Sequence, residues 1–480
     1  MNPAASLHSR RDFLQQLGGG FGGVALAALL HREVQAANPL AAKRGHHVAK
    51  ARAVIQIFCP GGLSHVDSWD YKPELARRQG KPFDPDGKMQ FFASKPGNCQ
   101  GSWWPFRQHG QCGRWMSDLL PRLAQHVDDI AFIHSMQSKS ALHGPAMFMA
   151  NSGFTVPGFP SMGAWVTYGL GSESDDLPAF VVLPDPRGLP PGDVINWGAG
   201  FLPAIHQGTT LQTDPGKPPI SDLFPPKSFE HLSGDAERSS RDFLQTLNRQ
   251  HAAAREGNTE LDARIAAYEL AARLQLSAPE ATDIRGESDA TKKLYMLDHE
   301  DIGPFGRQCL LARRLVERGV RFVQIYCGAE NTTAKKIRPN WDSHEDLVRD
   351  HGYWGPILDS GAAALLGDLK SRGLLESTLV ICTTEFGRQP AAQGAGKGRD
   401  HNPGAFTAWM AGGGIKGGTA FGETDELGFK AVVDPAYCYD LHATALHLLG
   451  LDHEKLSFYN NGIQRRLMDV HGHVIQKIIA

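Results

Sequence analysis

Short apolar runs rich in branched side chains alternate along this chain with segments of helical apolar spacing. The runs expected to form strands are residues 53–59, 130–134, 180–183, 320–326, 379–383 and 406–410. The segments expected to form helices are residues 119–126, 145–153, 305–318, 353–372 and 439–449. A run that is apolar throughout suits a strand buried on both faces, as in a parallel sheet. The alternation therefore predicts an α/β fold with a mostly parallel central sheet and helices on both faces.

Residues 1–36 resemble a twin-arginine export signal. Arg10 and Arg11 precede an apolar, Gly-rich run over residues 17–30, and residues 34–36 have the small-residue pattern of a cleavage site. The alternative is a basic amphipathic N-terminal helix. No other segment approaches the ~18 unbroken apolar residues of a membrane span. We therefore expect a periplasmic or secreted protein with no membrane span after removal of the signal.

After the signal we expect a linker over residues 37–52 and one α/β domain over residues 53–480. Residues 233–276 contain no proline and are rich in Ala, Arg, Glu, Leu and Gln, which predicts a helical insertion. Residues 73–117 are expected to form an irregular, Trp-rich loop. Because 49 basic residues nearly balance 51 acidic ones, the charge gives no indication of binding to nucleic acid or to an anionic membrane.

None of the seven cysteines forms a C-x-x-C pair, which excludes zinc-ribbon and thioredoxin-like sites. Cys59, Cys327 and Cys382 end apolar runs and are expected to be small buried hydrophobes. Cys99 and Cys112 flank an aromatic loop, and export would allow a disulfide between them. The sequence leaves this pairing open.

Three clusters that mix carboxylates with imidazoles follow three of the expected strands. They are His65, Asp67 and Asp70; Asp342, His344 and Asp346; and Glu385, Asp400 and His401. Ligands of α/β proteins bind outside the carboxyl ends of the strands, so these clusters are candidates for one shared site. Their donor types suit zinc, or manganese where oxygens dominate, whereas calcium would want mostly oxygens. The clusters therefore predict a divalent metal site, with zinc preferred and manganese or calcium as alternatives.

Two arginines and one histidine complete the candidate site. Arg388 and Arg399 lie beside the last cluster, and guanidinium groups bind phosphate or sulfate oxygens in bidentate fashion. The alternative is that these arginines pair with Glu385 and Asp400. His143 stands at a strand-to-helix turn, before a helix N-terminus that would attract anions.

Six motifs spread over the chain resemble the DUF1501 family. They are GGLSHVDSWDYKPE at residues 61–74, GFPSMGAWVTYGLG at 158–171, WDSH at 341–344, TEFGR at 384–388, GRDHNP at 398–403 and AGGGIKGG at 411–418. Proteins of this family are exported bacterial proteins, and the resemblance implies a fold similar to alkaline phosphatases and sulfatases. It covers nearly the whole chain after the signal.

The resemblance implies a two-metal site. Asp342 is similar to the aspartate of the first metal, with His344 or Asp346 as its companion, and His401 is similar to the late histidine of that metal. Glu385 stands where the aspartate of the second metal would be.

The chain also departs from the superfamily pattern at three positions. Phe386 stands where a second-metal histidine would be, and Pro60 where the first-strand aspartate would be, so His65 or Asp67 would have to replace it. His143 stands at the position of the nucleophile, where an imidazole can be a covalent acceptor or a metal ligand.

These features favour metal-dependent hydrolysis of a sulfate or phosphate ester in the cell envelope. The expected substrate is an anionic small molecule or a sulfated or phosphorylated glycan. The alternative is a catalytically degenerate binding or assembly protein for polysaccharide or for an exported, cytochrome-like protein partner.

Overall fold

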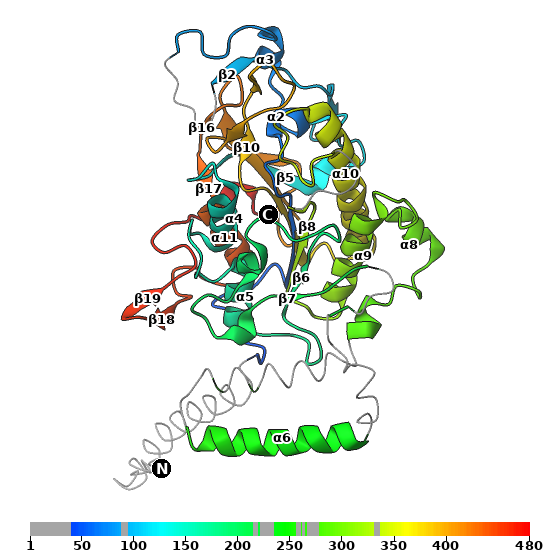
Figure 1. The fold of residues 1–480 in the computed structure, drawn as a ribbon, viewed down its shortest axis with the longest axis vertical. Coiled ribbons are helices and arrows are strands. Elements are labelled where there is room, and N and C mark those ends of the chain that lie inside the picture. The colour runs from blue at the N-terminus through cyan, green and yellow to red at the C-terminus, as the bar shows by residue number, and fades with distance from the viewer. Residues whose placement is uncertain are drawn as a thin grey trace, which may run out of the picture.

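A computed structural model of the chain describes residues 40–87, 95–214, 219–220, 235–255, 261, 265, 278–330 and 337–480. The expected export signal and much of the expected helical insertion lie outside the described residues. Within that insertion the structure describes helix α6 (Asp235–Ala253), which stands apart from the sheet and its helices (Figure 1).

The described residues form a central sheet of nine strands. Its order is β14-β5-β13-β9-β1-β8-β6-β7, and β17 also pairs with β5. The strands are β1 (Ala53–Phe58), β5 (Ile130–Gln137), β6 (Phe180–Leu183), β7 (Thr209–Thr210), β8 (Phe322–Tyr326), β9 (Thr378–Thr383), β13 (Phe406–Ala411), β14 (Thr419–Phe421) and β17 (Ala436–Tyr437). The six strands expected from the apolar runs are thus confirmed within one or a few residues at each end.

Five consecutive strands of this sheet, from β9 through β1, β8 and β6 to β7, are parallel to one another. Strand β13 is antiparallel to both of its neighbours, β9 and β5, so β5 runs in the same direction as β9. The prediction of a mostly parallel α/β sheet is confirmed. The one reversal, at β13, was not predicted, because an apolar run of six residues has the same pattern in either direction.

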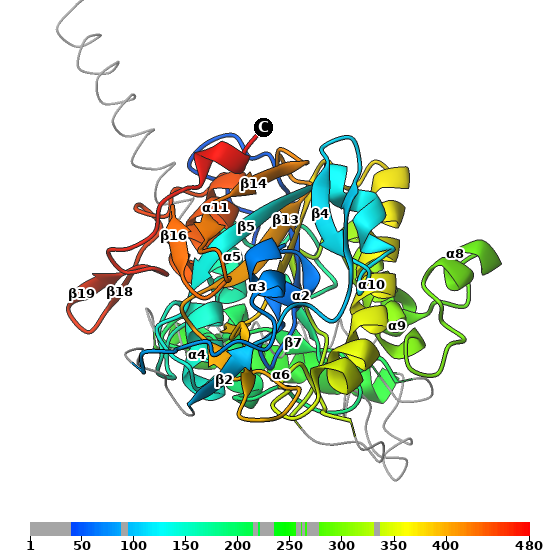
Figure 2. The same ribbon diagram turned by 90° about the horizontal axis from the view of Figure 1, so that it is seen from above.

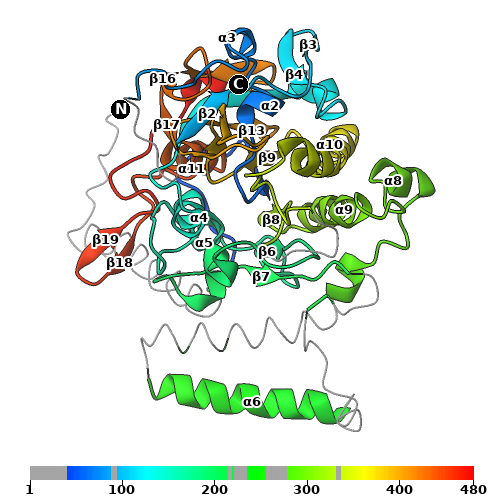
Figure 3. The same cartoon turned by 45° about the horizontal axis from the view of Figure 1, so that its top comes forward.

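Helices cover both faces of the sheet, as Figures 2 and 3 show. Val54 and Phe58 of β1 pack on the side of α4 (His143–Ser152), α5 (Met162–Leu170) and α11 (Cys438–Leu448). Ile55 and Ile57 pack on the side of α9 (Gly303–Glu317) and α10 (Leu347–Ser371). Because side chains alternate along a strand, β1 contributes to two separate cores.

Helix α10 begins at Leu347, before the expected start near residue 353. The side chain of Asp346 accepts a hydrogen bond from the backbone N–H of Arg349 and caps the helix. Pro356 lies inside the helix without ending it. The segment expected as a helix at residues 119–126 is instead a 3-10 helix, η1 (Leu123–Asp129).

The Trp-rich segment is less irregular than expected. It contains α3 (Pro73–Arg77), strand β2 (Pro96–Cys99) and the hairpin β3 (Phe106–His109) and β4 (Arg114–Ser117), which contacts the short helix α2 (His65–Ser68). Cys99 is buried, Cys112 is exposed, and both are free thiols. Strand β2 pairs with β11 (Ala391–Gln393), and β10 (Gly387–Arg388) pairs with β12 (His401–Asn402).

The remaining described elements lie outside the central sheet. They are α8 (Asp289–Leu294), β15 (Glu423–Thr424), β16 (Ala431–Val433), β18 (Phe458–Asn460), β19 (Ile463–Arg465) and the 3-10 helices η2 (Asp193–Trp197), η3 (Ala204–His206) and η5 (Gln476–Ile478). Among the described helices, none has both the length and the apolar composition that crossing a bilayer requires.

The buried histidine His442 predicts a loss of stability in acid. Its Nε2 donates to the carbonyl of Ala150, 3.0 Å away, and burial lowers the pKa of His442 to about 4. The unfolded chain therefore takes up this proton near pH 6.5, before the folded chain does. Stability should fall by up to about 3 kcal/mol as the pH drops from about 6.5 to about 4, and this contribution should be constant above that range.

Urea unfolding at several pH values tests this. His442→Gln keeps a donor for the Ala150 carbonyl but cannot titrate, so its free energy of unfolding should depend less on pH than that of the wild type. The exposed His251 of α6 provides a control, because His251→Gln should follow the wild-type profile. If His442→Gln had the same pH profile as the wild type, the loss of stability in acid would not come from His442.

Candidate metal centre

Four segments bring polar side chains to one edge of the sheet. Asp342 and His344 follow β8, Glu385 follows β9, and His143 begins α4 after β5. Because β5, β8 and β9 run in the same direction, their carboxyl ends meet at that edge. His401 arrives from β12, which is held by pairing with β10.

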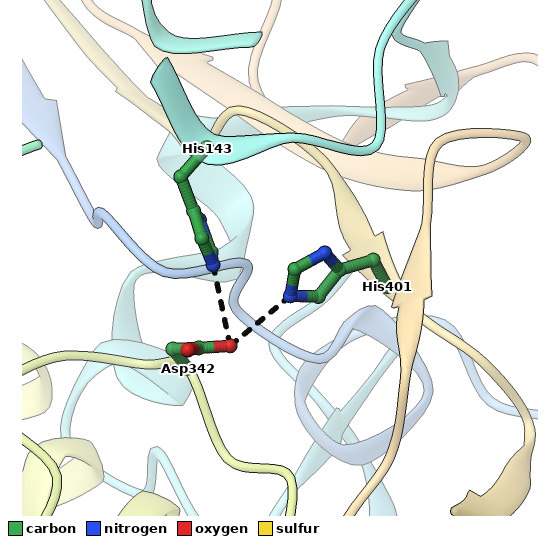
Figure 4. Close-up of side chains that lie close together, drawn as sticks. All are labelled: His143, Asp342 and His401. Atoms are coloured by element: carbon green, nitrogen blue, oxygen red, sulfur yellow. Dashed lines mark hydrogen bonds and ion pairs between the residues drawn. The ribbon is translucent and has the colours of Figure 1, made fainter. Parts of the chain in front are cut away.

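Three imidazoles converge on a single carboxylate oxygen, and Figure 4 shows two of them. The Oδ1 atom of Asp342 lies 2.7 Å from Nε2 of His344, 3.1 Å from Nε2 of His401 and 3.3 Å from Nε2 of His143. The Nε2 atoms of His344 and His401 are 3.0 Å apart. Ligand atoms bound at ~2.0–2.1 Å lie about 2.9 Å apart in an octahedron and about 3.3 Å apart in a tetrahedron. The ligand atoms of His143, Asp342 and His401 lie within 4.8 Å of one another, so these three residues could hold a small cation. His344 adjoins them through its contact with Oδ1 of Asp342.

The other nitrogen of each imidazole has its own acceptor. The pairs are Nδ1 of His143 with Oε1 of Glu385 at 2.7 Å, Nδ1 of His344 with Oε1 of Gln393 at 2.5 Å, and Nδ1 of His401 with the carbonyl of Ala141 at 2.6 Å. An acceptor at Nδ1 holds a proton there and makes Nε2 the metal-binding atom. Three nitrogens and one oxygen form a donor set that suits borderline divalent cations better than calcium.

The charges at the centre reinforce each other. Burial opposes ionisation of Asp342, but Arg388 and the three imidazoles outweigh it and hold the pKa of this carboxyl far below its usual range. Burial also disfavours a charged His143, but Asp342 and Glu385 outweigh it and raise the pKa of His143 to about 9. Burial lowers the pKa of His401, which favours its neutral, metal-binding form. A cation would thus replace the Nε2 proton of His143.

The Arg388 guanidinium is fully buried and faces protein acceptors. Its Nε donates a hydrogen bond to the carbonyl of Gly62 at 2.9 Å, and its Nη2 donates one to Oδ1 of Asp342 at 2.5 Å. Further hydrogen bonds join it to the carbonyls of Gly61 and Arg399. The expected role of Arg388 was anion binding, and the structure instead places it behind Asp342, where it fixes the carboxylate.

The Arg399 guanidinium is also fully buried, and it pairs with Asp67 rather than with Asp400. Its Nε lies 2.8 Å from Oδ2 of Asp67, and its other donors reach the carbonyls of Gln389, Gln100 and Gly101. These contacts assign Arg399 and Asp67 to a buried ion pair. They leave the expected anion-binding role of Arg399 and the expected ligand role of Asp67 without a geometric basis.

The other expected residues take several positions. His65 is turned away from the centre, with Nε2 2.8 Å from the carbonyl of Gly428. Asp400 lies beside the centre: Oδ1 is 4.0 Å from Nδ1 of His344 and accepts the backbone N–H of His401. Glu385 is present but is occupied by His143 and by the N–H of Gly61.

Two further residues shape the centre. The ring of Phe386 lies 4.4 Å from that of His401 between centroids, so this residue forms an apolar wall where a histidine was expected. Gln393 was not identified from the sequence, because no motif marks a neutral side chain that acts through another residue.

Comparisons with known proteins give the following matches. The DUF1501 family model, described as a protein of unknown function, matches residues 51–479. No curated protein matches the chain. A matched structure, the PsFucS1 sulfatase from Pseudoalteromonas sp., is 13% identical, with 94% of this chain and 75% of that chain covered and a TM-score of 0.34.

Two other matched structures have similar scores. The lipoteichoic acid synthase LtaP from Listeria monocytogenes is 8% identical, with 91% of this chain and 81% of that chain covered and a TM-score of 0.33. A mutant of TAB5 alkaline phosphatase with Mg bound is 8% identical, with 79% of this chain and 96% of that chain covered and a TM-score of 0.34. These scores are too low to carry any statement about the reaction of this chain.

The buried pair of Arg399 and Asp67 predicts a large effect on stability. Arg399→Met would leave the Asp67 carboxylate buried without its partner, which should cost about 3–5 kcal/mol of the free energy of unfolding. Arg107 provides a matched control, because its ion pair with Asp118 is exposed and Arg107→Met should cost less than about 1 kcal/mol. Urea unfolding measures both. If Arg399→Met were as stable as Arg107→Met, Arg399 would not have this structural role.

Proposed function

Because the chain belongs to the DUF1501 family and brings three imidazoles to one carboxylate, we propose that it is a metal-dependent hydrolase of sulfate or phosphate esters. The observation that carries the proposal is the convergence of the Nε2 atoms of His143, His344 and His401 on Oδ1 of Asp342. The resemblance of its motifs to the DUF1501 family implies a fold similar to alkaline phosphatases and sulfatases, and this supplies the substrate class.

These four side chains would hold one divalent cation, which we propose to be zinc or manganese. The chemistry that such a cation supplies is Lewis acidity, which favours hydrolysis of phosphate and sulfate esters. The side chains of Asp342, His143 and His344 are 20–24% exposed, so substrate and water can reach the centre.

The surrounding residues would orient the ligands and limit access of water. Arg388 holds Asp342 in place, and Glu385 holds the proton on Nδ1 of His143. Phe386 covers one side of His401 and His143 with its ring. Of the two roles that the sequence left open for His143, the proposal gives it that of a ligand. Its Nδ1 is paired with Glu385, and its buried Nε2 lies 3.3 Å from Oδ1 of Asp342 without a hydrogen-bond partner.

A binding protein for polysaccharide is the second candidate, and one surface feature favours it. Tyr71, Phe106 and Trp115 form an aromatic cluster, with centroid distances of 4.3 Å between Tyr71 and Trp115 and 5.2 Å between Tyr71 and Phe106. Tyr71 and Trp115 are more than a third exposed, at 37% and 39%. Exposed aromatic rings offer apolar faces on which a sugar ring can pack.

Metal analysis of the purified protein, beside assays with an aryl sulfate and an aryl phosphate, tests the proposal. We expect one divalent ion per chain and turnover of at least one of the two esters. His401→Ala removes a ligand and should lower metal affinity and turnover on the order of 100-fold or more. His47→Ala should match the wild type. A metal-free, inert protein that binds an acidic glycan would favour the second candidate.

We also propose that the protein acts in the periplasm or outside the cell, after export by the twin-arginine route. The paired arginines Arg10 and Arg11, followed by the apolar run, support this proposal. The double variant Arg10→Lys and Arg11→Lys should remain in the cytoplasm with its signal uncleaved. Cell fractionation and the mass of the mature chain measure this. Normal export of the variant would show that another signal directs it.

A further inference from the structure

Gln393 makes a direct contact with one of the histidines of the metal centre. It is the last residue of β11, and its Oε1 lies 2.5 Å from Nδ1 of His344. A side-chain carbonyl oxygen can only accept a hydrogen bond, and so can the carboxylate of Asp342 beside Nε2 until a cation takes that place. The contact with Gln393 therefore favours the tautomer of the neutral imidazole that has its proton on Nδ1. The lone pair of His344 is then on Nε2, the atom 2.7 Å from Oδ1 of Asp342.

The position of Gln393 is fixed from both sides of its strand. On one side Gln393 is paired with Pro96 of β2, and Ala391 is paired with Cys99. On the other side the backbone N–H of Gln393 donates to the carbonyl of Gly398, 2.9 Å away. The Trp-rich segment at residues 73–117, which includes β2, thus supports the residue that contacts His344.

The three imidazoles differ in the acceptor that each one uses. His143 uses the charged Glu385, His401 uses the backbone carbonyl of Ala141, and His344 uses the neutral side chain of Gln393. A backbone carbonyl cannot be removed by substitution, and Glu385 also holds the N–H of Gly61. Gln393 is therefore the acceptor whose loss should affect one histidine and little else.

We propose that Gln393 is a positioning residue, which fixes the Nδ1–H tautomer of His344 and so aims its Nε2 at the metal. This inference rests on the metal centre of the proposed function, but not on the identity of the ester. It gives Gln393 no contact with the substrate or with the cation.

Two variants with side chains of equal length separate the effect of the hydrogen bond from the effect of side-chain size. Gln393→Met keeps the length but has no strong acceptor, whereas Gln393→Glu keeps an acceptor at the same place. We expect the dissociation constant of Co²⁺, measured by competition with a chelating dye, to rise about 10- to 100-fold in Gln393→Met. Gln393→Glu should bind Co²⁺ close to the wild-type level. Gln464→Met, on the peripheral strand β19, controls for the substitution itself.

A second measurement reads the tautomer without any metal. In protein labelled with ¹⁵N-histidine, long-range ¹H–¹⁵N spectra at mildly alkaline pH distinguish Nδ1–H from Nε2–H imidazoles, and His344→Gln identifies the signals of His344. The wild type and Gln393→Glu should hold more of the Nδ1–H form of His344 than Gln393→Met does, because in Gln393→Met only the carboxylate of Asp342, 2.7 Å from Nε2, is left to accept the proton. Thermal unfolding checks that all variants are folded.

The outcomes separate this inference from the proposed function. If Gln393→Met binds Co²⁺ as tightly as the wild type and keeps the Nδ1–H form, Gln393 has no positioning role. If the wild type binds metal but hydrolyses neither ester, the proposed hydrolase function is wrong, whereas the positioning role of Gln393 is unaffected. A wild type that binds no Co²⁺ would overturn both, because no metal would remain for His344 to be aimed at.

Discussion

The buried guanidinium of Arg388 joins three parts of the chain that are far apart in the sequence. It donates to the Gly61 and Gly62 carbonyls after β1, to Asp342 after β8, and to the Arg399 carbonyl before β12. A buried cation is costly unless its donors are satisfied and an opposite charge lies near. The hydrogen bonds of Arg388 therefore hold the segments after β1 and β8 together. They also fix Asp342, on which the three imidazoles converge.

In the metal centre, the three imidazoles surround that fixed carboxylate, and further groups orient the imidazoles. The parallel strands deliver the ligands to one edge, and Glu385, Gln393 and the Ala141 carbonyl then orient each imidazole by its Nδ1 atom. Phe386 closes one side with an aromatic ring. The resemblance implied two metals, whereas among the described residues one group of ligand atoms, from His143, Asp342 and His401, is close enough to share an ion. In this arrangement Glu385 acts through His143.

Arg388 and Arg399 show why a sequence motif alone does not assign a role. Both stand near the same loop, and both were expected to bind an anion. Each is fully buried, and each has an aspartate partner from a distant segment, Asp342 for Arg388 and Asp67 for Arg399. An arginine whose donors are taken up by carbonyls and a carboxylate has little left to offer a substrate oxygen. Which acceptors surround a guanidinium depends on packing, and packing is not visible in a short motif.

The sequence by itself determined the α/β class, the six main strands and the clusters at the strand ends, because these follow from apolar periodicity and local residue types. The resemblance of its motifs indicated the family. The tertiary structure decided which candidates meet: His143, Asp342, His344 and His401 do, whereas His65 and Asp67 turn elsewhere. It also decided that β13 runs antiparallel and that Gln393 contacts His344. These depend on strand order and side-chain direction, which are set by burial of apolar surface and by hydrogen bonding between distant segments.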